Sequence, residues 1–120
     1  MSEEKIVNHS SGYLAVMELS KSPIYSFGEI TSNWLDVIHG CYLAQMEAGI
    51  GDVFYATSVT SILRRVKPGH GYFPTLTKLV DIGILKKLII PGGGGKQVEP
   101  LYMMPDPNGV ALALHELGYL

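Results

Sequence analysis

Residues 72–85 read YFPTLTKLVDIGIL, and this stretch decides the fold that we expect for the chain. Its apolar residues recur at every third or fourth position, which predicts a helix from about residue 72 to residue 82. Pro74 falls in the first turn of that helix, where a backbone N–H has no helical partner, so its ring is tolerated there. Gly83 directly after the last apolar residue is typical of a helix stop.

A second helix is expected just before this stretch, from Thr57 or Ser58 to Val66, because its apolar residues also follow helical spacing. The sequence KPGHG at 67–71 separates the two helices. Proline and two glycines cannot continue a helix, so these residues predict a short turn. The result is a helix-turn-helix arrangement.

A third, longer helix is expected upstream, starting at the candidate N-caps Thr31 or Ser32 and ending at Gly49, which suits a C-cap. Cys41 lies in the middle of this apolar run, and we expect it to be buried and reduced. Four large side chains follow the same apolar spacing, and we expect them to pack in the core instead of lining an effector pocket: Trp34, Tyr42, Met46 and Phe54.

The hydrophobic period changes after Gly83. Two strand-like runs, ILKKLIIP at 84–91 and QVEPLYMM at 97–104, flank the glycine-rich segment PGGGGK at 91–96, which predicts a β-hairpin. Pro100 inside the second run indicates an edge strand. The sequence DPNG at 106–109 predicts a turn, followed by a short closing helix over 110–117.

These elements predict an α+β, mainly α fold, a winged helix-turn-helix with a three-helix core and a two-stranded β-hairpin wing. Residues 31–120 would form this domain, and residues 1–30 an N-terminal extension and possible dimerisation element. Residues 13–19, YLAVMEL, form either a helix or a strand in that extension. The chain has 120 residues, of which 47% are hydrophobic, so one domain with a real core is expected.

Charge is distributed unevenly along the chain. The net charge of −2 is unfavourable for a nucleic-acid-binding protein. Residues 64–96, however, hold seven of the nine basic residues and a single acid, Asp81. A local basic patch matters more than net charge for binding a polyanion, so this segment favours a nucleic-acid partner.

The stretch from Tyr72 to Leu85 resembles the recognition-helix signature of the PadR-like winged-helix regulators, with its aromatic-proline start, two leucines three apart, and a glycine before two aliphatic residues. The glycines and Lys96 at 94–96, then Tyr102 and the Asn108-Gly109 turn, are similar to that family's wing. The resemblance covers about residues 40–115. It implies a homodimeric transcriptional repressor, although only about ten residues follow the Asn108-Gly109 turn, where the family usually carries a long C-terminal helix for dimerisation.

The expected function is therefore sequence-specific binding of double-stranded DNA. Tyr72, Thr75, Thr77 and Lys78 would form the exposed face of the recognition helix and read bases or sugars. Other expected DNA-binding residues would contact the phosphate backbone, from the second helix and the residue after it or from the wing: Ser58, Ser61, Arg64, Lys67 and Lys96. His70 in the turn is also an expected DNA-binding residue.

Other functions are less well supported by the sequence. The four histidines and single cysteine have no zinc-ligand spacing, so we expect no metal and no cofactor. IIPGGGGKQ departs from the phosphate-binding loop pattern, and no nucleophile–base pairing is visible, so we expect no enzyme. The polar, acidic start and the lack of a long apolar run lead us to expect a cytoplasmic protein without membrane contact. A winged-helix module that binds other proteins and not DNA remains an alternative.

Overall fold

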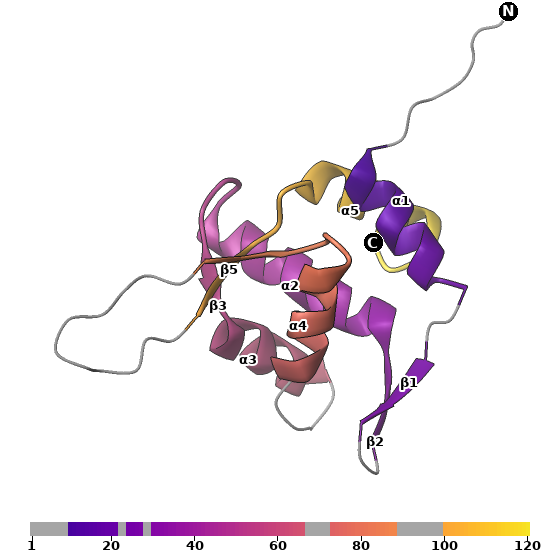
Figure 1. The fold of residues 1–120 in the computed structure, drawn as a ribbon, viewed down its shortest axis with the longest axis horizontal. Coiled ribbons are helices and arrows are strands. Elements are labelled where there is room, and N and C mark those ends of the chain that lie inside the picture. Colours follow the sequence, from indigo (N-terminus) through magenta and orange to yellow (C-terminus); the bar gives the residue numbers. More distant parts are fainter. Residues whose placement is uncertain (1–9, 22–23, 28–29, 67–72, 89–99) are drawn as a thin grey trace, which may run out of the picture.

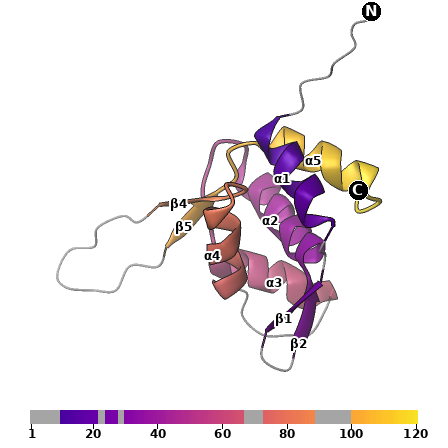
Figure 2. The same cartoon turned by 45° about the vertical axis from the view of Figure 1, so that its right-hand side comes forward.

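The structure, a computed structural model, describes residues 10–21, 24–27, 30–66, 73–88 and 100–120 (Figure 1). This part of the chain is α+β and mainly helical. Its helices are α1 Ser11–Leu19, α2 Trp34–Ala48, α3 Ala56–Val66, α4 Phe73–Asp81 and α5 Pro107–Glu116. The longest of them, α2, lies between the α1–α5 pair and α3 in both views (Figures 1 and 2).

The strands form two antiparallel sheets. One is a hairpin of β1 Ile24–Phe27 and β2 Ile30–Asn33. The other has three strands, β3 Phe54–Tyr55, β4 Lys86–Leu88 and β5 Leu101–Met103, in the spatial order β3–β5–β4. Because β3 connects α2 to α3, this sheet ties the segment after α4 to the helices before it.

The start of α2 corrects one expectation. Thr31 and Ser32 lie in β2, and Asn33 is the N-cap, because its Oδ1 accepts a hydrogen bond of 2.7 Å from the Leu35 N–H. The expected end at Gly49 is confirmed. Gly49 has a φ of 110° and donates its N–H to the Gln45 carbonyl, a conformation that favours glycine.

β5 corrects a second expectation. Pro100 was expected to mark an edge strand, but β5 is the central strand of its sheet. The ladder pairs start at Leu101, so Pro100 precedes the strand and its missing N–H removes no ladder bond. The edge strand β3 was not expected at all, since two residues are too few to show a period.

One hydrophobic core joins the helices and the three-stranded sheet. Cys41 and Phe54 are buried in it, as expected, with exposed fractions of 0% and 3%. Trp34 and Tyr42 pack against this core in partly buried positions, and Met46 is also half-buried. The core takes residues from every helix: Tyr13, Val16, Val37, Ile38, Val59, Leu63, Leu76, Leu79, Val110 and Leu114.

Residues 13–19 are helical and form most of α1, which packs on α5. Two glycines allow this approach, because a Cβ on Gly12 would lie 2.9 Å from the Asp106 carbonyl oxygen and one on Gly109 would overlap the Ser10 hydroxyl oxygen at the start of α1. Asp106 Oδ2 accepts from the Gly12 N–H at 2.9 Å, and its Oδ1 from the Gly109 N–H at 3.1 Å. The expected turn at 106–109 is thus the N-cap and first turn of α5, with Pro107 starting the helix.

Candidate nucleic-acid interface

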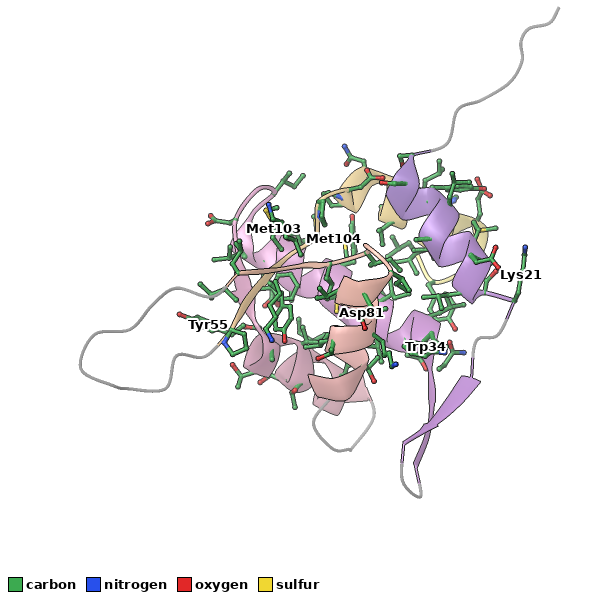
Figure 3. All side chains as sticks on the ribbon, in the orientation of Figure 1. Lys21, Trp34, Tyr55, Asp81, Met103 and Met104 are labelled. Atoms are coloured by element: carbon green, nitrogen blue, oxygen red, sulfur yellow. The ribbon has the colours of Figure 1, made fainter. Side chains whose placement is uncertain are left out.

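Helix α4 presents one polar face to solvent and one apolar face to the core. Leu76 and Leu79 are fully buried, whereas Thr77, Lys78 and Asp81 are exposed. In Figure 3, the labelled Asp81 lies on this helix. Two of the four residues expected on the exposed face, Thr77 and Lys78, therefore lie there.

Thr75 does not, and this expectation is wrong. Its exposed fraction is 4%, because successive helical residues are separated by 100° and Thr75 lies on the same side as Leu76 and Leu79. The sequence pattern contained this signal, since Thr75 and Leu79 are four residues apart. A side chain in this position cannot reach a base edge.

Helix α3, like α4, has an apolar face in the core and a polar face toward solvent. Val59, Ile62 and Leu63 are buried, Ser61 is exposed and Ser58 is half-buried. Both serines were expected to contact phosphates, and Ser61 is the more accessible of the two. Within this helix, the Thr60 hydroxyl donates a hydrogen bond of 3.2 Å to the Ala56 carbonyl oxygen.

The remaining expected contacts are not described by the structure. Arg64 belongs to α3, of which only the backbone is described at this position. Four other residues, and with them the tip of the expected wing, lie outside the described residues: Lys67, His70, Tyr72 and Lys96.

Strand β4 adds two exposed lysines, Lys86 and Lys87, that were not among the expected contacts. They belong to the basic segment, but the sequence did not show which face of a strand each would take. The sheet register supplies this information, because Lys87 lies opposite Tyr102 and Lys86 opposite Met103.

Tyr102 marks the face of the sheet that turns toward the helices. Its side chain is fully buried, and its ring stacks on that of Phe54 with the centroids 6.2 Å apart. Burial raises the pKa of Tyr102. Burial also raises the pKa of the Cys41 thiol of α2 far above its usual range, so this thiol stays protonated and has little nucleophilic character.

Hydroxyl groups and ammonium groups thus dominate the exposed surface of α3, α4 and β4. Hydroxyls donate or accept hydrogen bonds and lysines carry fixed positive charge, which suits a polyanion with many oxygen acceptors. Asp81 is the exception, because its carboxylate lies on the same exposed face of α4 as Thr77.

Comparison of the chain with protein-family models, with curated proteins and with solved structures finds no match. Among the described residues, no helix is long and apolar enough to cross a membrane. The same residues contain no group of three or more histidine, cysteine, aspartate or glutamate side chains arranged to hold a metal ion.

Proposed function

We propose that residues 31–120 form a winged helix-turn-helix and bind double-stranded DNA, and that the protein acts as a homodimeric transcriptional repressor of the PadR-like kind. One observation carries this proposal. Helices α3 and α4 share a core through their apolar faces, expose hydroxyl and lysine side chains on their other faces, and are followed by paired strands.

The order of elements supports the winged-helix part of the proposal. Helix α2, helix α3 and helix α4 precede the antiparallel pair β4–β5, as a three-helix core precedes its wing. Strand β3 pairs with β5 and so anchors that pair to the helices. The residues between β4 and β5 include the glycines and Lys96, and this is where a wing would approach the DNA backbone.

The exposed face of α4 is the recognition surface in this proposal. The major groove is about 12 Å wide and admits a helix with short side chains. Thr77 can exchange hydrogen bonds with a base edge or a sugar, and Lys78 can bind a guanine edge or a phosphate. Ser61 and Arg64 on α3 would contact the phosphates beside this groove.

Fluorescence anisotropy with random duplex DNA at low salt tests the proposal. We expect binding that weakens steeply as salt rises, because bound phosphates release counterions. The variant Lys78→Ala should bind more weakly and reduce the slope of log affinity against log salt by about one for the lost phosphate contact. Complete absence of wild-type binding at a protein concentration of about 50 µM, in the range where non-specific complexes form, would contradict the proposal.

The protein-interaction alternative keeps one specific observation in its favour, the net charge of −2 with acids concentrated outside residues 64–96. This alternative predicts a folded protein that does not bind DNA at any salt concentration. A sizing measurement on the free protein tests the homodimer independently.

A further inference from the structure

We propose that Lys87 on β4 binds the phosphate backbone of the DNA that α4 engages, and that its neighbour Lys86 does not. This inference rests on the proposed function and adds a contact that the sequence pattern could not assign. It starts from the register of the three-stranded sheet, in which consecutive residues of a strand point to opposite faces.

Lys87 belongs to the helix-facing side of the sheet. It lies opposite Tyr102 on β5, and Tyr102 lies opposite Phe54 on β3, so the three side chains form one row across the sheet. Tyr102 and Phe54 are buried against the helices, with exposed fractions of 0% and 3%. Lys87 ends this row at the edge strand, where it is exposed.

Lys86 belongs to the opposite side. It lies across from Met103, and residues two positions along the same strands, Leu88 and Leu101, share that face with Tyr55. Tyr55 has an exposed fraction of 47%, and Leu101, although buried at 6%, does not belong to the core cluster that Tyr102 and Phe54 share with the helices, so this face is directed away from that core. Figure 3 shows the labelled Tyr55 at the sheet, apart from Asp81 on α4.

A tight turn fixes β4 next to α4. The N–H groups of Ile84 and Leu85 both donate to the Leu79 carbonyl, at 3.0 and 3.2 Å, and both side chains are buried. Lys87 follows Leu85 by two residues, which is about 7 Å of extended chain. Figure 2 shows β4 leaving the end of α4 in this way.

The two lysines therefore lie on opposite faces of the three-stranded sheet. Lys87 lies on the side of the sheet that packs with α4 and the other helices, and Lys86 lies on the opposite side. A lysine ammonium is a compact charge with three donors, and it binds a phosphate oxygen without demanding a planar partner. DNA bound along α4 thus offers its backbone to Lys87 and not to Lys86.

The test compares Lys87→Ala with Lys86→Ala in anisotropy titrations of one duplex DNA across a salt series. Each variant removes one positive charge from the same strand, so a general effect of net charge is equal in both. We expect Lys87→Ala to bind several-fold more weakly and to reduce the log–log salt slope by about one, with Lys86→Ala close to the wild type. Lys87→Arg should retain the slope, and circular-dichroism melting confirms that the variants are folded.

The outcomes separate this inference from the function on which it rests. Equal effects of the two alanine variants, or a larger effect of Lys86→Ala, would overturn the assignment of Lys87 even if Lys78→Ala lowers the slope as expected. A wild-type protein that does not bind duplex DNA would overturn the proposed function, and the role of Lys87 with it.

Discussion

At the residue scale, Gln45 is the polar side chain on which the fold depends most clearly. It is fully buried in α2, and all its bonds go to the backbone. Its Nε2 donates to the carbonyls of Gly49 and Asp52 at 2.6 and 2.9 Å, and its Oε1 accepts from the Met104 N–H at 2.7 Å. One side chain thus joins the turn after α2 to the end of β5.

We expect Gln45→Met to lower the free energy of unfolding by about 2–4 kcal/mol, because it preserves volume but leaves a buried N–H and two carbonyls without this partner. Urea denaturation measures the change. Gln45→Glu should be at least as destabilising at pH 7, because a carboxylate cannot donate to the two carbonyls. If Gln45→Met unfolds within about 0.5 kcal/mol of the wild type, the typical range for neutral surface changes, Gln45 is not the link described here.

At the element scale, Asp106 links α5 to α1. The hydrogen bond from Ser10, followed by those from the Gly12 and Gly109 N–H groups, holds the pKa of Asp106 below its usual range, while its partial burial acts in the opposite direction. A carboxyl group with a lowered pKa in the folded state stabilises the fold above its unfolded pKa of about 3.9. This stabilisation disappears as the pH falls through the lower folded pKa.

Asp106→Ala should therefore reduce stability at pH 7 by about 1 kcal/mol, as expected for loss of an N-cap. The difference from the wild type should begin to shrink below about pH 4, where the carboxyl of the unfolded wild type takes up a proton, and should shrink further until the pH passes the lowered folded pKa. Thermal melts of both proteins across this pH range provide the measurement. A difference that stays constant down to pH 2 would show that the charge of Asp106 contributes nothing.

The elements themselves differ in how far the sequence could predict them. Helices with a long apolar stripe, such as α3 and α4, were placed to within a residue or two, because burial imposes their period. The hairpin β1–β2 and the short β3 were missed, since strands of two to four residues carry little pattern. The sequence around Asp106 predicts a turn and not a cap, because N-caps and turns favour the same residue types.

At the scale of the whole molecule, the candidate interface was only partly predictable. The excess of basic residues in residues 64–96 indicated which segment would bind DNA. Helical spacing then predicted that Thr77 and Lys78 lie on the exposed face of α4. The same spacing, followed through to Leu79, also excludes Thr75. The faces of Lys86 and Lys87 depend on the pairing of β4 with β5, and residues far apart in the chain decide that register.

Two acidic residues in different parts of the molecule allow a test of how the molecule is oriented on DNA. Asp81 lies on the exposed face of α4, whereas Glu18 lies on α1, where it pairs with Lys21 at 3.2 Å. In both views α1 lies with α5 at the upper end of the molecule, opposite α3 (Figures 1 and 2). If α4 faces the DNA, Asp81 repels the phosphates at close range and Glu18 does so only from a distance.

We therefore expect Asp81→Asn to tighten duplex DNA binding several-fold at 0.15 M salt, where the screening length is about 8 Å. Glu18→Lys changes the net charge by twice as much, yet it should alter affinity less at this salt concentration. Near 0.01 M salt the screening length is about 30 Å, so both variants should bind more tightly than the wild type. If Glu18→Lys has the larger effect at 0.15 M, then the α1–α5 end approaches the DNA, and the orientation proposed here is wrong.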